Sequence, residues 1–149
     1  MHRKGCDFAT RRLVISEQNV ESIRRMIETA NASGWNPDIV DEWVHPEARV
    51  YPASDFPGPD VYVGREDVTA FLREWISTFD DLRWELEQLI DLGDRVIVLA
   101  RMIGTSGTSG IAVDWPFGGV FGDFRDGMFA EARYFMDQKA ALEAVGLSE

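Results

Sequence analysis

The chain has 149 residues, of which 45% are hydrophobic and 11% aromatic, enough to bury the core of one domain of ordinary size. Its formal net charge is -11. The first twelve positions contain four basic residues, Arg3, Lys4, Arg11 and Arg12, so the rest of the chain is more acidic still. A nucleic-acid-binding protein needs a basic surface that displaces counterions from phosphates. The composition therefore argues against a nucleic-acid partner.

The cysteine count and the hydropathy narrow the class of protein further. Cys6 is the only cysteine, so no intrachain disulfide can form, and the sequence contains no Cys/His cluster for structural zinc. No apolar run reaches the ~18 residues of a membrane span, and the first 12 residues contain no apolar signal segment. We therefore expect a cytoplasmic protein that does not enter a membrane and holds neither a metal nor another cofactor.

The N-terminal third predicts an arm and two helices. Residues 1–15 are expected to form a flexible basic arm, ahead of a single domain over residues 16–149. Ser16 is the expected N-cap of a first helix, because apolar residues then recur on one helix face at Val20, Ile23, Ile27 and Ala30. Asp38 is expected to cap a short second helix that includes Trp43 and Val44. Pro46 should prevent its continuation, because the ring lacks an N–H and clashes with the preceding turn.

The middle of the chain predicts a strand, a loop and a third helix. A short strand over residues 48–51 precedes a loop from Pro52 to Tyr62, whose prolines and glycine exclude regular structure. A helix is expected from about Arg65 to Phe79, where apolar residues keep helical spacing at Val68, Phe71, Leu72, Trp75 and Phe79. We interpret that face as part of the core.

From Leu82 the apolar residues alternate, which predicts a strand with one buried face that includes Trp84, Leu86 and Ile90. Three more strands follow, over residues 95–104, 111–124 with an interruption at 116–119, and 128–136, before Asp137 caps a final helix. Helices followed by a four-strand antiparallel meander predict an α+β fold. Because strand 95–104 is apolar on both faces and one helical layer covers only one of them, we expect a homodimer.

Five short segments mark helix starts, turns and caps in a definite order. They are His45-Pro46-Glu47, Tyr62-Val63-Gly64-Arg65-Glu66, Asp91-Leu92-Gly93-Asp94-Arg95-Val96, Arg125-Asp126-Gly127 and Ala140-Ala141-Leu142-Glu143-Ala144-Val145-Gly146-Leu147. Their order and spacing over residues 16–147 resemble the SnoaL-like branch of the nuclear transport factor 2 and ketosteroid isomerase superfamily. The resemblance implies a cone-shaped, curved antiparallel sheet wrapped on three N-terminal helices, an α+β barrel with an apolar ligand pocket, commonly in a homodimer.

The resemblance also implies where catalytic groups would lie, and the residues at those places do not match. The carboxylate base of the ketosteroid isomerase pattern corresponds to Tyr51 or Pro52, and its protonated acid falls near Gly119 or Val120. The Asp-Arg-Asp network of limonene epoxide hydrolases would need an acid after Arg101, where Met and Ile follow instead. Neither mechanism is supported by matching residues.

Weaker catalytic candidates remain. Asp55 lies close in sequence to the expected base position, and desolvation against aromatic neighbours would raise the pKa of its carboxyl group. The alternative for Asp55 is an exposed loop residue that accepts hydrogen bonds from turn amides. Tyr51 and Tyr134 are candidate hydrogen-bond donors. His45 is a candidate acid/base near neutral pH, with a structural role at the end of a helix as its alternative.

Seven aromatic residues are expected to contribute the ligand-binding wall: Trp43, Phe56, Tyr62, Trp75, Trp115, Phe117 and Tyr134. Three hypotheses stay open. The protein is a metal-free isomerase or cyclase that acts by general acid/base catalysis on a carbonyl-containing or polycyclic substrate, or it binds a small apolar molecule without reacting with it, or it serves as a dimerisation module. A buried carboxylate at the cavity favours the first, a purely apolar and hydroxyl lining the second, and a filled core the third.

Overall fold

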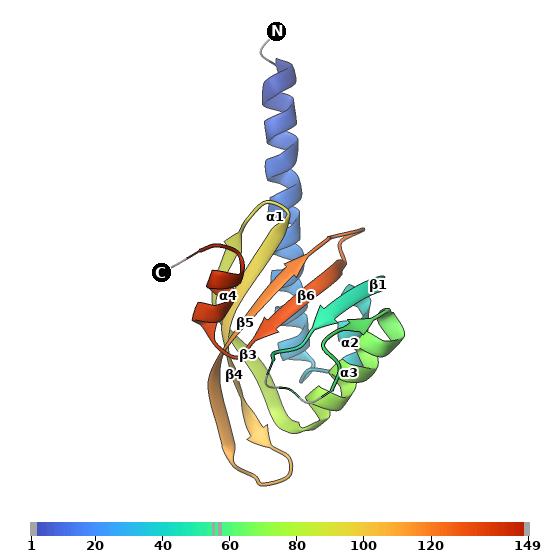
Figure 1. Ribbon diagram of the computed structural model, residues 1–149, viewed down its shortest axis with the longest axis vertical. Coiled ribbons are helices and arrows are strands. Elements are labelled where there is room, and N and C mark those ends of the chain that lie inside the picture. The colour runs from blue at the N-terminus through green and yellow to red at the C-terminus, as the bar shows by residue number, and fades with distance from the viewer. Residues whose placement is uncertain (1–2, 55, 57, 148–149) are drawn as a thin grey trace.

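The computed structural model describes residues 3–54, 56 and 58–147, with side chains from residue 17 onward except those of 39 and 40. Its elements are α1 (Arg3–Ala32), α2 (Pro37–Val40), a 3-10 turn η1 (Asp41–Trp43), β1 (Val44–Tyr51), β2 (Tyr62–Val63), α3 (Arg65–Ser77), β3 (Phe79–Asp91), β4 (Arg95–Ser106), β5 (Ala112–Gly122), β6 (Phe129–Phe135) and α4 (Gln138–Ala144) (Figure 1). None of the helices in this described part is long and apolar enough to span a membrane.

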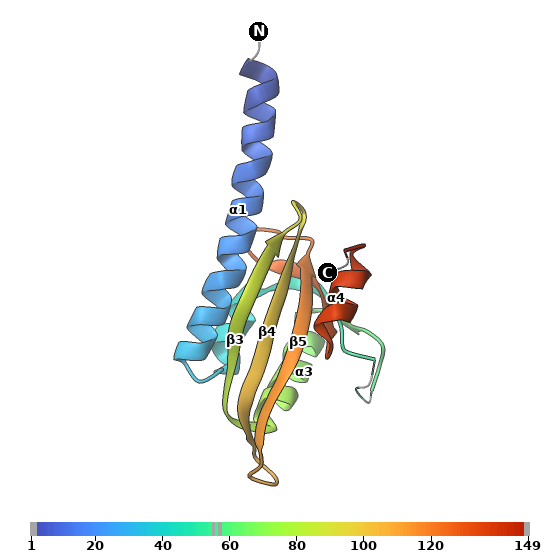
Figure 2. The same cartoon turned by 90° about the vertical axis from the view of Figure 1, so that its left-hand side faces the viewer.

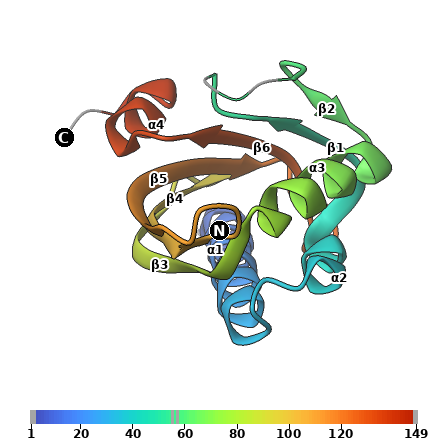
Figure 3. The same ribbon diagram turned by 90° about the horizontal axis from the view of Figure 1, so that it is seen from below.

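One curved, six-stranded sheet holds all the strands, in the order β2-β1-β6-β5-β4-β3. The strands β3 to β6 pair with their neighbours in antiparallel fashion, as the alternating pattern predicts. The β1–β6 pair is parallel and brings the N-terminal half of the chain into the sheet. Seen from below, the sheet curls around α1 and α3, which lie on its concave side (Figure 3). This arrangement confirms the predicted α+β fold.

The first helix is longer than predicted. It begins at Arg3, so Ser16 lies inside it and is not its N-cap. No proline interrupts residues 3–32, and an existing helix gains one hydrogen bond for each residue added, so it propagates past the apolar-periodic region. The N-terminal half of α1 projects beyond the sheet in Figures 1 and 2. The boundary between an arm and a domain at residue 15 stays a prediction.

The segment around Pro46 is a strand and not the end of a helix. Asn36 caps α2, because its Oδ1 accepts a hydrogen bond from the Asp38 N–H at 2.9 Å, so Asp38 is not the cap. β1 starts at Val44, and its register with β6 shifts before Arg49. Pro46 lies in this irregular stretch, where a missing N–H costs no ladder hydrogen bond. The prediction that the helix includes Val44 is therefore wrong, whereas Trp43 ends the 3-10 turn η1 that follows α2.

Two further local predictions fail for reasons of strand geometry. The register of β3 with β4 shifts between Leu86 and Gln88, and this bulge moves Ile90 from the concave face to the opposite one. β5 is not interrupted, because Pro116 pairs with Arg101 of β4. β6 pairs with β5 only from Gly118 onward, so Pro116 faces an open edge on that side, where a proline is tolerated.

Both faces of the sheet are covered by the chain itself. On the concave side a large core joins α1 and α3 to the sheet, and on the other side α4 packs its Ala141 and Leu142 on Ile97, Leu99 and Val120. The side chain of Asp137 accepts a hydrogen bond from the N–H of Lys139 at the start of α4, which confirms it as the predicted N-cap. Because α4 covers this apolar patch, the argument for a homodimer loses its premise. The homodimer stays a prediction.

Candidate functional site

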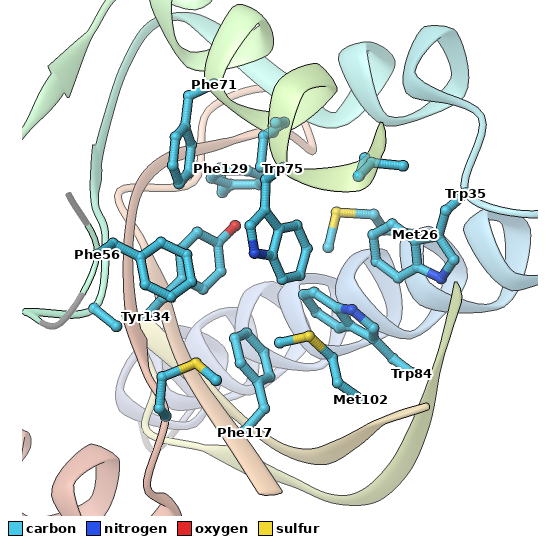
Figure 4. Close-up of a pocket in the computed structure, with 14 residues that line it drawn as sticks. Met26, Trp35, Phe56, Phe71, Trp75, Trp84, Met102, Phe117, Phe129 and Tyr134 are labelled. Carbon is cyan, nitrogen blue, oxygen red and sulfur yellow. The ribbon is translucent and has the colours of Figure 1, made fainter. Parts of the chain in front are cut away.

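A cavity lies between the two core helices and the concave face of the sheet. Its walls come from α1, α3, four strands and the loops beside them (Figure 4), and its lining residues are Met26, Trp35, Ala53, Phe56, Phe71, Leu72, Trp75, Ile76, Trp84, Met102, Phe117, Phe129, Tyr134 and Met136. The free space is only about 30 Å³, on the order of one or two water molecules. The side chains therefore fill most of the cone.

The wall nearest α1 is an aromatic stack. The ring centroids of Trp35 and Trp84 are 4.5 Å apart, those of Trp84 and Phe117 are 4.6 Å apart, and those of Phe117 and Tyr134 are 5.5 Å apart. Tilted ring pairs at these distances add to the free energy gained from burial. This wall consequently has little freedom to move.

Asn31 of α1 fixes the start of that stack. Its Oδ1 accepts hydrogen bonds from the Trp84 backbone N–H at 2.9 Å and from the Trp35 indole N–H at 2.8 Å. Its Nδ2 donates to the Trp84 carbonyl at 2.9 Å. Because β3 is an edge strand, Asn31 pairs backbone groups that the sheet leaves open. One amide thus holds the helix, the strand and two tryptophans together.

Polar groups in the cavity lining are few. Tyr134 carries the hydroxyl group among the described lining residues, and burial raises the pKa of this phenol well above its ordinary value. It therefore stays protonated near neutral pH and can donate a hydrogen bond. None of the described lining residues is a carboxylate, an imidazole, a lysine or an arginine. Within the described part of the chain, acidic, histidine and cysteine side chains form no cluster that would hold a metal ion.

A second hollow, which we call the groove, adjoins the cavity. It has a volume of about 310 Å³ and is lined by Phe56, Tyr62, Phe71, Glu74, Trp75 and Thr78. Three of these residues, Phe56, Phe71 and Trp75, also line the cavity, so the two spaces share a wall. In Figure 4 the side chains of Phe71 and Trp75 descend from α3 toward the rings of the sheet.

Of the three predicted catalytic residues, the structure describes Tyr51 and His45. Asp55 lies outside the described residues, although Ala53 and Phe56 on either side of it line the cavity. Tyr51 lies on the outer face of the sheet, where the Arg133 guanidinium sits 3.9 Å from the centre of its ring. His45 is a strand residue, and its Nδ1 accepts a hydrogen bond from the Glu47 N–H at 3.0 Å. Tyr51 and Tyr134 both line a further hollow together with Arg133, whereas His45 is not among the residues that line it.

The predicted ligand-binding residues divide into two groups. Phe56, Trp75, Phe117 and Tyr134 line the cavity, and Tyr62 lines the groove. Trp43 and Trp115 pack against the core, and each indole N–H is buried without a hydrogen-bond partner among the described residues. Trp115 contacts Phe79 edge to face at 6.0 Å, away from the lining of both hollows.

Sequence reasoning missed several lining residues. Trp84 and Met102 alternate onto the inward face of their strands, so the period of two places them correctly but gives no sign of a cavity. Met26 keeps the spacing of the buried face of α1, next to Ile27. Trp35 follows the predicted end of the first helix. Its φ is positive, at 60°, and its ring packs against that of Trp84. No local sequence pattern indicates this conformation.

The fold and the cavity define a protein of the nuclear transport factor 2 and ketosteroid isomerase type. A family model described as a SnoaL-like domain matches residues 23–132, and the chain therefore belongs to this family. A protein from Jannaschia sp. CCS1, assigned as a SnoaL-like polyketide cyclase, is 28% identical with a TM-score of 0.68, over 89% of this chain and 94% of that chain. Comparison with curated proteins gives no match.

Two more distant structures share the fold. SalBIII, an epoxide hydrolase/cyclase-like enzyme of pyran ring formation in the polyether salinomycin, is 20% identical with a TM-score of 0.65, over 80% of this chain and 90% of that chain. A protein with a ketosteroid isomerase-like fold from Catenulispora acidiphila, solved with trimethylamine, is 16% identical with a TM-score of 0.61, over 81% and 92% of the two chains. At these identities the likeness concerns the fold alone.

Proposed function

We propose that the protein binds a small, largely apolar molecule in the cone-shaped cavity. The observation that carries this proposal is the lining, in which aromatic and aliphatic side chains surround one protonated phenol and the described residues contribute no charge. Pockets with this composition suit ligands whose surface is mostly apolar and which accept one or two hydrogen bonds. Between the two hypotheses that involve a ligand, such a lining favours binding without chemical reaction.

Ligand entry must move side chains, because about 30 Å³ cannot hold a molecule larger than water. Three methionines are suited to this movement: Met26, Met102 and Met136. Their unbranched, polarisable chains repack at low cost, unlike the aromatic stack on Asn31. We therefore infer that the ligand takes the space of these methionines and lies against the fixed rings of Trp84 and Phe117.

The test compares two tryptophans that differ in their relation to the cavity. Trp75 and Trp115 are both half-buried and both contact Phe79 edge to face, at 5.5 and 6.0 Å. Only Trp75 lines the cavity and the groove. The neutral fluorophore N-phenyl-1-naphthylamine is titrated into the wild type and into Trp75→Ala and Trp115→Ala, and its emission is followed.

The wild type should enhance the emission of the fluorophore saturably. Trp75→Ala should weaken binding about tenfold or more, because a stacked aromatic contact of ~1–2 kcal/mol is lost, while Trp115→Ala should stay within about threefold of the wild type. Thermal unfolding of both variants provides the control for folding. No saturable binding to the folded wild type, or an equal loss in both variants, would contradict the proposal.

A second candidate is acid/base catalysis of the isomerase or cyclase type, with Asp55 as the base and Tyr134 as the hydrogen-bond donor. Two observations favour it. Ala53 and Phe56 line the cavity on either side of Asp55, and the raised pKa of Tyr134 keeps its proton available to a developing oxyanion. A similar protein, the one from Jannaschia sp. CCS1, is assigned as a polyketide cyclase.

A further inference from the structure

We propose that the ligand is a cationic amphiphile, with an apolar body in the cavity and an ammonium group in the groove beside Glu74. The inference rests on the proposed function, because it names the ligand class of that same site. It follows from the aromatic residues that line the groove, from one carboxylate and from the distribution of charge around both hollows.

One face of α3 supplies most of the groove. Phe71, Glu74, Trp75 and Thr78 are spaced i, i+3, i+4 and i+7, which places all four side chains on one side of the helix. Tyr62 stacks on Phe71 with ring centroids 4.4 Å apart. Trp75 is held edge to face against Phe79 at 5.5 Å. Several aromatic rings thus lie in fixed orientations around one hollow.

Aromatic rings in such a group bind cations. The face of each ring carries negative charge, and an ammonium group within about 6 Å of a ring centroid is attracted to it, most strongly by tryptophan and tyrosine. Several rings around one hollow are the arrangement that recognises quaternary ammonium groups. The groove offers four aromatic residues for this purpose: Phe56, Tyr62, Phe71 and Trp75.

Glu74 supplies a full negative charge at the same place. It forms no ion pair with any residue in the described part of the chain. Arg73, the basic residue next to it in sequence, is bound on another side of the helix, with its Nη2 2.7 Å from Asp38 and 2.8 Å from Asp41. The carboxylate of Glu74 is therefore available to a ligand.

The charge around both hollows disfavours an anionic ligand. No lysine, arginine or histidine occurs among the described residues that line the cavity or the groove. The chain carries a net charge of -11, so the surrounding potential attracts cations and repels anions. A neutral ligand would gain from the rings but not from Glu74. A cation gains from both, and this difference can be measured.

The experiment compares benzyltrimethylammonium with neopentylbenzene, its neutral isostere in which a carbon atom replaces the charged nitrogen. Affinities are measured by ligand-observed NMR at micromolar protein. The variants are Glu74→Gln and, as the matched control, Glu66→Gln, which makes the same chemical change on the face of α3 that carries Arg73. Glu74 and Glu66 are both exposed, so both variants should fold, and thermal unfolding checks this.

The wild type should bind the cation about tenfold more tightly than the isostere, because ring faces and carboxylate each contribute a few-fold. Glu74→Gln should weaken binding of the cation roughly three- to tenfold and leave the isostere unchanged. Glu66→Gln should change neither. Raising the salt concentration should weaken the cation alone, since an exposed charge pair is screened.

Equal or tighter binding of the neutral isostere by the wild type would overturn the inference while leaving the proposed function intact. The same conclusion follows if Glu74→Gln binds the cation as the wild type does, or if the charge-reversed variant Glu74→Lys still prefers the cation. Failure of N-phenyl-1-naphthylamine and both isosteres to bind would instead overturn the proposed function, and the inference with it.

Discussion

Replacing Asn31 with alanine tests whether one amide positions the rigid wall of the cavity. Asn31→Ala removes three hydrogen bonds at once, those with the Trp84 N–H, the Trp84 carbonyl and the Trp35 indole N–H. Trp35 and Trp84 are only 4% exposed, so water reaches the released groups poorly. The expected result is a less stable protein whose aromatic stack is also less ordered.

The magnitude follows from the number of hydrogen bonds. Each contributes ~0.5–1.5 kcal/mol net, and a buried group left without a partner lies toward the upper end of that range. Three of them amount to about 3 kcal/mol, a fall in Tm of roughly 6–12 °C for a protein of this size. Alanine favours the helix slightly over asparagine, which offsets a few tenths of a kcal/mol at most.

Urea and thermal unfolding followed by tryptophan fluorescence measure this change. The matched control is Asn19→Ala, the same substitution on the same helix, where Asn19 makes no side-chain hydrogen bond within the described part of the chain. It should remain within about 0.5 kcal/mol of the wild type. An Asn31→Ala variant as stable as the control would refute the assigned role of this amide. Unchanged binding of N-phenyl-1-naphthylamine would show that the aromatic stack keeps its arrangement without Asn31.

Two further predictions concern Asp55 and Tyr134. If the protein is an enzyme, Asp55→Asn should slow deuterium exchange at the α-carbon of bound 2-tetralone ~10²–10⁴-fold, because a general base acts in the transition state. The affinity of the variant for 2-tetralone should stay within about tenfold of the wild type. An unchanged exchange rate would exclude Asp55 as the base. Because burial raises the pKa of Tyr134, the unfolded phenol ionises first, near pH 10, so the folded state binds more protons and the free energy of unfolding falls above that pH. Tyr134→Phe should lessen this alkaline loss in urea unfolding at pH 8 and pH 11, whereas an equal loss in both proteins would argue against the shift.

The four-strand meander could be predicted because the apolar residues change from helical to alternating spacing at Leu82. Leu82 and Trp84 alternate with charged residues, and both lie on the concave face. The failures occur where pairing overrides local preference. Pro46 ends a helix by its own chemistry, yet it sits in a strand because β1 pairs irregularly with β6 at that point. The bulge before Gln88 depends on β4 and leaves no mark in the sequence of β3.

The candidate site was predictable in composition but not in shape. Aromatic residues such as Trp75 and Phe117 belong to apolar faces, and apolar faces indicate a core without showing whether the core contains a cavity. Trp115 sits on the same face of β5 as Phe117 but packs near Phe79, beyond the cavity. Glu74 could not be predicted as a site residue, because a single charged residue on a helix usually faces solvent. Its relevance depends on Tyr62, which comes from a different element and stacks on Phe71.

The distribution of rigidity through the domain explains how one set of side chains can serve as both core and binding site. On the side of α1, Asn31 and the close ring contacts hold Trp35 and Trp84 in place whether or not a ligand is present. On the side of α3, half-buried rings separate the cavity from the groove, and Met102 and Met136 line the space between the two sides. A ligand that took the proposed route from the groove would displace the unbranched methionines and leave the hydrogen-bonded wall intact, so binding would not require the domain to give up the contacts that keep it folded.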